Sequence, residues 1–180
     1  MATLTRRRLN WGCAAVVASA ALAACGFTPL YAEHGGDASS SSSAMADLAG
    51  ISIRPLADRP GMRLNQVLRA DLQPRGPADH MPYTLDITLT SRVEELGIRK
   101  DATSSRANFI MAASFYLSAG NKRVFGDRVQ SVVGYNILDD QFATVSAQAD
   151  AQERAIREIS AGIKTRLSVY FRKVQQAQAG

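Results

Sequence analysis

The stretch Tyr83-Thr-Leu-Asp-Ile-Thr-Leu-Thr90 decides the fold class of this chain. Apolar residues occupy every second position, and Thr or Asp occupies the positions between them. Such strict alternation is typical of a β-strand with one buried face and one face in water. The sequence therefore predicts a sheet whose apolar face is covered by a second layer.

Two further strands are predicted after this one, over residues 107–117 and 124–135. The inward positions of the first are Phe109, Met111, Ala113, Phe115 and Leu117. A tight hairpin turn joins the two strands at Gly120 and Asn121, which tolerate the positive φ that such a turn requires. Gly126 is a candidate for a bulge in the last strand.

Two helices complete the predicted fold. A short apolar strand over 48–54 precedes the first helix, which Asp58 can cap and which ends before Pro74. From about residue 144 to 174, apolar residues recur at steps of three and four, which is the period of one long amphipathic helix. These residues are Ile156, Ile159, Ile163, Leu167, Tyr170 and Val174. The order β-α-β-β-β-α predicts an α+β two-layer sandwich, with two helices packed on one mainly antiparallel four-stranded sheet.

The N-terminal segment has the three zones of a secretory signal. A basic run at residues 6–8 precedes an apolar stretch at 11–22, and two small residues then precede Cys25. The sequence Leu22-Ala-Ala-Cys25 resembles the bacterial lipobox, which predicts cleavage before Cys25 and its modification by a diacylglycerol and an N-acyl chain. A plain secreted protein with a chance cysteine is the alternative.

Three regions follow from this interpretation. Residues 1–24 are a cleaved lipoprotein signal peptide, and residues 25–46 are a lipidated cysteine and a flexible tether rich in Ser and Gly. Residues 47–176 form the folded sandwich domain. Gly26 stands where bacterial sorting rules place an Asp in lipoproteins of the inner membrane, so we expect the periplasmic side of the outer membrane.

Charge and cysteine content narrow the classes of function. The 180-residue chain has a formal charge of +5, which falls to +2 when the three arginines at 6–8 leave with the signal. A near-balanced charge removes the main support for nucleic-acid binding. Cys13 also leaves with the signal, and Cys25 is lipidated, so no disulfide, thiol nucleophile or CxxC metal site is expected.

The sequence offers little for catalysis. His34 and His80 have no nucleophile or ligand-spaced partner, and the adjacent acids at 94–95 and 139–140 are interpreted as solvated turn residues. No GxSxG, HExxH or phosphate-binding glycine loop is present. We therefore expect no enzyme, no metal and no cofactor beyond the lipid on Cys25.

Cations gather near both predicted hairpin turns, which lie at opposite ends of an antiparallel sheet. Those near the first turn are Arg92, Arg99, Lys100 and Arg106, and those near the second are Lys122, Arg123 and Arg128. Acidic neighbours reduce the first group to a net charge of +1. A mixed, solvated surface is the simpler interpretation, and a site for phosphorylated lipid is the alternative.

The segment Cys25-Gly-Phe-Thr-Pro-Leu-Tyr31 resembles the start of the LptE family of lipopolysaccharide-assembly lipoproteins, in its alphaproteobacterial form. The predicted order of strands and helices is similar to that family across nearly all of the mature chain. The resemblance implies an outer-membrane lipoprotein that plugs the lumen of an LptD-like β-barrel. Such a protein assists assembly of the barrel and delivery of lipopolysaccharide to the cell surface.

The same resemblance implies lipopolysaccharide contacts through basic residues near the strand turns and in the loop before the last helix. The candidates near the first turn are Arg99, Lys100 and Arg106. The second location departs from the family pattern, because residues 138–150 contain no Lys or Arg. Direct lipid contact is therefore less secure than the role of barrel plug.

Two other classes of function stay open. An auxiliary lipoprotein of a phospholipid-transport complex would share the lipobox, the size and the α/β layers, but copurifying partners would differ. An envelope hydrolase is disfavoured by the missing nucleophile and base, and activity assays would test it.

Overall fold

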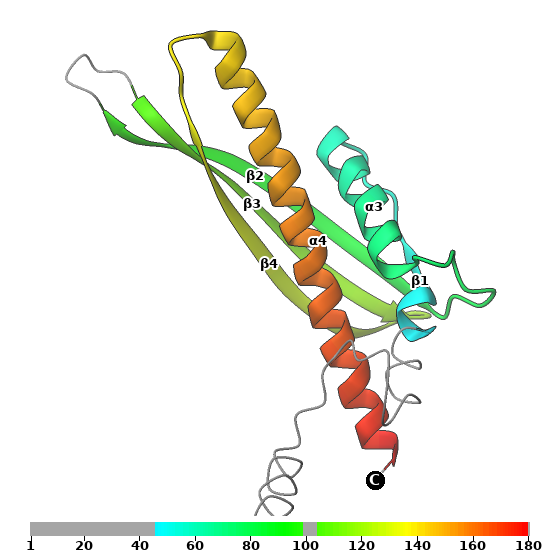
Figure 1. Ribbon diagram of the computed structural model, residues 1–180. Coiled ribbons are helices and arrows are strands. Elements are labelled where there is room, and N and C mark those ends of the chain that lie inside the picture. Colours follow the sequence, from blue (N-terminus) through cyan, green and yellow to red (C-terminus); the bar gives the residue numbers. More distant parts are fainter. Residues whose placement is uncertain (1–45, 99–103, 180) are drawn as a thin grey trace, which may run out of the picture. The chain divides into compact units, whose positions relative to one another are not determined.

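The computed structural model describes residues 46–98 and 104–179, which belong to one compact unit. Cys25, the predicted signal and nearly all of the tether lie outside the described residues. The elements follow the predicted order (Figure 1). They are β1 (Ile51–Ile53), α3 (Arg59–Leu72), β2 (Tyr83–Ile98), β3 (Ser104–Ala119), β4 (Lys122–Asn136) and α4 (Gln141–Ala179).

The four strands form one mixed sheet in the order β1-β2-β3-β4. β1 runs parallel to β2 and pairs with it only at Tyr83–Leu85, whereas the other two pairings are antiparallel and long. Both helices pack on the same face of the sheet and on each other. The predicted α+β two-layer sandwich is confirmed.

β2 is twice as long as the alternating stretch that predicted it. It continues from Thr90 to Ile98, where every residue except Gly97 pairs with β3. Polar residues break the apolar alternation in this half, because α4 covers the inward face there only in part and leaves Val93 42% exposed. Pairing between strands, not burial of side chains, extends the strand.

The irregularity in β4 lies at Val124 and not at Gly126, so the predicted position of the bulge is wrong. Leu117 pairs with Phe125 and Ser118 with Arg123, which leaves Val124 without a partner in β3. Gly126 serves a different purpose. A Cβ atom at this position would lie 2.6 Å from Cδ1 of Tyr116, so glycine makes room for the tyrosine ring.

The core lies between the sheet and α4. The predicted inward set of β3 is buried, as are Ile156, Ile159, Ile163 and Leu167 of α4. The C-terminal part of α4 differs from the prediction. Phe171 is 1% exposed, while Tyr170 and Val174 are only partly buried. Phe171 lies four positions after Leu167, so it continues the buried face of the helix. Tyr170 lies at the edge of this face, where its ring stacks on that of Phe125 with the centroids 4.9 Å apart.

Polar contacts fix the two helices against each other. The Ser160 hydroxyl donates to Oδ2 of Asp71 at 2.5 Å, and Nε of Arg63 lies 3.1 Å from the Glu153 carboxylate. Ser160 is fully buried, so this hydrogen bond satisfies a polar group that would otherwise be costly inside the core.

Candidate functional site

The structure describes one of the three residues proposed to contact lipopolysaccharide. Arg99 and Lys100 lie outside the described residues. Arg106 is exposed near the start of β3, where it pairs with Leu96 of β2 and Asn136 of β4. Because β3 is antiparallel to both neighbours, this end of the sheet is opposite the turn between β3 and β4.

Arg106 lines a depression of about 390 Å³ between the end of β4 and the first turns of α4. The other lining residues are Gly134, Tyr135, Asn136, Leu138, Ala147, Asp150 and Arg154. Arg154 donates from Nε to Oδ2 of Asp150 at 2.9 Å. Two cations therefore flank the depression, and Arg154 is paired with a carboxylate.

A further acid influences the same end of the sheet. The pKa of the Tyr135 phenol is raised above its usual value, first by burial and then by the negative charge of Glu95. Glu95, Ala107 and Tyr135 lie side by side across three strands. An anionic ligand here would meet both attraction from the arginines and repulsion from acids.

Residues 138–150, which the sequence analysis compared with the loop before the last helix, belong to α4 from Gln141 onward. α4 begins at Gln141, where the Phe142 amide donates to Oδ1 of Asp140 at 2.8 Å. Asp140 thus satisfies one of the free amides at the helix start and caps α4. Phe142 itself is 81% exposed and has apolar neighbours along the helix.

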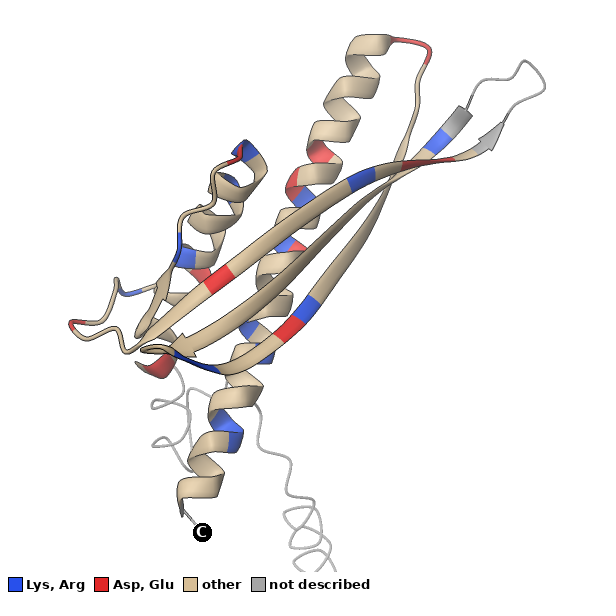
Figure 2. Cartoon of the chain, turned by 180° about the vertical axis from the view of Figure 1, so that it is seen from behind, with Lys and Arg blue, Asp and Glu red and all other residues tan. Residues whose placement is uncertain are grey.

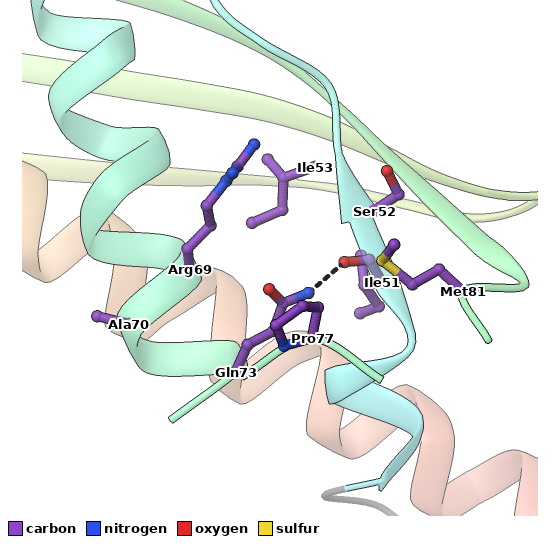
Figure 3. A pocket seen from close by; sticks show the side chains of 8 residues that line it. All are labelled: Ile51, Ser52, Ile53, Arg69, Ala70, Gln73, Pro77 and Met81. Atoms are coloured by element: carbon purple, nitrogen blue, oxygen red, sulfur yellow. Dashed lines mark hydrogen bonds between the residues drawn. The ribbon is translucent and has the colours of Figure 1, made fainter. Parts of the chain in front are cut away.

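A second depression of about 440 Å³ lies between β1 and the end of α3 (Figure 3). Nε2 of Gln73 donates to the carbonyl oxygen of Ile51 at 2.8 Å, which is the dashed line in the figure, and to that of Ala49 at 3.3 Å. These carbonyls lie beside the free edge of the sheet, so the Gln73 amide blocks that edge. The geometry assigns Gln73 an edge-protecting role and no chemistry.

The most extensive surface is the face of the sheet that carries no helix (Figure 2). Its outward side chains are mostly polar or charged, and the exposed apolar exceptions are Leu96, Tyr116 and Val132. The polar side chains include Thr84, Thr88, Thr90, Asn108, Ser114, Gln130 and Asn136. Ile110 and Ala112 also point outward but are each 6% exposed, because they lie on the central strand between flanking side chains. Val132 stands out, since it is 51% exposed beside Ile110.

The sequence analysis overlooked this face, although the signal was present. The Thr and Asp positions between the apolar residues of the alternating strand were interpreted only as solvent-facing. The same polar alternation recurs in β3 and β4, at Asn108, Ser114 and Gln130. Repeated in three neighbouring strands and interrupted at Ile110, Ala112 and Val132, it describes a largely polar surface.

Over residues 46–98 and 104–179, no group of three or more His, Cys, Asp or Glu side chains is placed to hold a metal ion. Within the same ranges, neither helix has a stretch long and apolar enough to cross a bilayer.

Solved structures of bacterial lipoproteins share the fold. A candidate lipoprotein from Caulobacter crescentus CB15 superimposes with a TM-score of 0.59 at 22% identity, covering 72% of this chain and 96% of that one. A minor lipoprotein from Acinetobacter baumannii gives 0.54 at 13% identity, covering 67% and 89%. No protein-family description and no curated protein matches the chain. At these identities the likeness establishes the fold.

Proposed function

We propose that this chain is an LptE-like lipoprotein of the outer membrane, held on the periplasmic side by the lipid on Cys25. Its domain lodges in the lumen of an LptD-like β-barrel, assists the assembly of that barrel and helps to deliver lipopolysaccharide to the cell surface. The observation that carries the proposal is the largely polar face of the sheet, which the helices leave uncovered.

This face has the chemistry and the size of a docking surface for a barrel wall. The lumen side of outer-membrane barrels is polar, so small hydroxyl and amide side chains can pair with it. β3 has 16 residues, so at about 3.3 Å per residue and about 4.8 Å between strands the three long strands present about 760 Å². One partner contributes about 800 Å² to a standard protein interface.

Two other observations support the proposal. The fold is shared with bacterial proteins described as lipoproteins. The sequence Leu22-Ala-Ala-Cys25 followed by Gly-Phe-Thr-Pro-Leu-Tyr31 resembles the start of LptE proteins. The lipobox supports the anchor, and the longer motif supports the barrel as partner.

Replacement of Val132 by Arg tests the docking face. The side chain is 51% exposed, so the longer residue reaches water in the free domain and should leave its melting curve unchanged. In a docked complex the guanidinium would be buried without a partner, at a cost of about 2 kcal/mol or more. We expect the amount of barrel that copurifies from outer membranes to fall about thirtyfold.

Met62→Arg is the matched control, because Met62 on α3 is also 51% exposed but lies in the helical layer. It should leave copurification unchanged. Equal loss in both variants, or in neither, contradicts docking through the sheet. Copurification of a phospholipid-transport complex in place of a barrel would favour the alternative function.

Direct contact with lipopolysaccharide is the second part of the proposal, through Arg99, Lys100 and Arg106. The structure adds Arg154, which lines the same depression as Arg106 from the side of α4. This arginine lies just beyond residues 138–150, where the sequence lacks the second basic group expected for the family. A two-sided grip on a phosphate therefore has a candidate on each side of the depression.

The contact is tested by replacing Arg99, Lys100 and Arg106 together by Ser. One charge-assisted hydrogen bond to a phosphate contributes about 1.5 to 3 kcal/mol. Titration with purified lipopolysaccharide should therefore show at least about tenfold weaker binding. Arg59→Ser on α3 is the control. Unchanged binding in the triple variant would remove this site while leaving the plug proposal intact, because exposed charges at a rim mainly affect association rates.

A further inference from the structure

Charge is distributed unevenly along the length of the domain (Figure 2). α4 contains no acidic residue after Glu158, but four cations follow in its second half. These are Lys164, Arg166, Arg172 and Lys173. The opposite end of the domain carries Glu94, Glu95, Asp139 and Asp140. The opposite end also carries Arg92, Arg106 and Arg154, so the domain is basic at one end and mixed in charge at the other.

Four cations gather at the end formed by the turn between β3 and β4 and by the lower part of α4. They are Lys122, Arg123, Arg172 and Lys173, and we refer to them as the basic end. Lys122 pairs with Ala119, which pairs with Tyr83 across the sheet. The Tyr83 ring lies 5.1 Å from that of Phe171, the residue before Arg172. Lys122 of β4 and Arg172 of α4 therefore lie at the same end of the domain.

The basic end keeps its charge. Among the described residues, no ion pair involves Lys122, Arg123, Arg172 or Lys173. The Arg123 guanidinium lies 3.8 Å from the centroid of the Tyr116 ring, a contact that holds the cation in place without neutralising it. Asp127, the acidic residue of β4, forms an ion pair with Arg166 of α4, in which Nε of Arg166 lies 2.7 Å from Oδ2 of Asp127.

The other charged groups at this end do not cancel that charge. Asp47 accepts a hydrogen bond from Nε2 of Gln175 at 2.7 Å and offsets one of the four positive charges. Arg75 and Asp79, in the segment between α3 and β2, carry opposite charges. The net charge of the end therefore stays positive.

The chain also enters the domain at this end. The hydrogen bond from Gln175 places Asp47, the second described residue, beside the lower part of α4. Residue 46 follows the proposed anchor at Cys25 by only 21 positions. The opposite end is far away, because the 39 residues of α4 span about 58 Å. The basic end is therefore the end at which the tether joins the domain.

We propose that the basic end docks the domain on the anionic phospholipid headgroups of the leaflet that holds its lipid. The proposal rests on the lipid anchor of the proposed function. Lys and Arg beside a lipid anchor are attracted to anionic headgroups, and a lipid plus a basic patch gives more stable attachment than a lipid alone. Before the domain enters a barrel, docking would hold its long axis away from the bilayer and present the polar face of the sheet sideways to that partner.

The test uses the processed, lipidated protein inserted into vesicles. Acylated Cys25 has no free thiol, so Asn121→Cys in the exposed turn beside Lys122 supplies a single site for a fluorescent donor. Energy transfer to an acceptor on lipid headgroups is compared between phosphatidylcholine vesicles with and without phosphatidylglycerol. A second protein carries the donor at Val145→Cys, near the start of α4, as the reference for the far end.

We expect phosphatidylglycerol to raise transfer from position 121 and not from position 145. Lys122→Gln combined with Lys173→Gln should lower the ratio of docked to undocked protein about 25-fold, because each residue contributes about fivefold near an anionic surface. Arg59→Gln combined with Arg92→Gln removes the same charge elsewhere and should have little effect. Salt near 1 M, where the screening length is about 3 Å, should abolish the difference.

Three outcomes would overturn the proposal. Equal transfer in neutral and anionic vesicles means that the domain does not dock. A rise in transfer that survives loss of Lys122 and Lys173 means that other residues are responsible. If the protein does not stay bound to neutral vesicles when the vesicles are floated on a density gradient, the proposed lipid anchor is wrong. The proposed docking through the basic end is then wrong as well, because it rests on that anchor.

Discussion

Replacement of Gly162 by Ala tests how closely α4 approaches the sheet. Gly162 lies in the interior of α4, where Ala would stabilise an isolated helix by about 1 kcal/mol. In the folded domain, a Cβ atom at this position would lie 2.6 Å from Cγ1 and 3.4 Å from Cγ2 of Val129 on β4. Val129 is 6% exposed and β-branched, so it has little freedom to move aside.

The gain in helix propensity and the close contact with Val129 oppose each other, and we expect the contact to have the larger effect on stability. Forcing an extra carbon into a packed core costs about 1 to 3 kcal/mol. After the gain in helix propensity is subtracted, Gly162→Ala should lower the free energy of unfolding by about 1 kcal/mol. Urea denaturation of the mature chain, followed by circular dichroism, measures this difference.

A double-mutant cycle with Val129→Ala isolates the contact. Val129→Ala alone should destabilise the domain, since it removes two buried methyl groups, but it also creates the space that a Cβ at position 162 needs. In that background Gly162→Ala should become stabilising, with a coupling energy of about 1 to 3 kcal/mol. If Gly162→Ala stabilises the unaltered protein by its full helix propensity, α4 does not lie this close to β4 and the packing described for the core is wrong.

Three further predictions address the anchor, the core and the response to pH. Cys25→Ala should abolish palmitate labelling and cleavage before residue 25; continued labelling would refute the lipobox. Truncation before Ile163 removes three almost fully buried side chains, those of Ile163, Leu167 and Phe171. Their burial together contributes about 4.5 to 9 kcal/mol to the free energy of unfolding, so the truncated domain should not fold. A cooperative melt at the original temperature would contradict the two-layer core. The pKa of Tyr83 is raised, first by burial and then by Asp47 and Tyr170, so the stability it contributes is complete below about pH 10 and is lost as the pH rises through its folded value. Tyr83→Phe should make alkaline unfolding less steep, and an unchanged pH profile would show that the phenol is not responsible.

Local patterns predicted the elements whose burial follows a regular period. The alternation in β2 up to Thr90 and the inward set of β3 were correct, because each inward residue meets the helical layer. The period of α4 was correct to Leu167. It failed at Phe171, since Tyr170 and Phe171 are adjacent aromatic residues and spacing alone did not decide which one faces the sheet. The stacking of Tyr170 on Phe125 is a tertiary contact that the sequence does not reveal.

Features that depend on pairing between distant residues could not be predicted. The second half of β2 is held by β3 although its own residues are polar, and the bulge at Val124 results from a register that both strands determine. For the candidate site, the sequence indicated cations near both hairpin turns. It did not indicate that Arg154 faces Arg106 across one depression, or that Lys173 lies level with Lys122, because α4 brings these residues together only after folding.

Crosslinking through the polar face of the sheet tests the central claim most directly. A photoactivatable amino acid replaces Val132 in the lipoprotein of living cells, and adducts are identified by mass spectrometry after irradiation. The account predicts one main adduct, with an outer-membrane β-barrel of the LptD type, and no such adduct from the same amino acid at Met62. Adducts from position 132 with a phospholipid-transport protein, or equal barrel adducts from both positions, would contradict docking of this face in a barrel lumen.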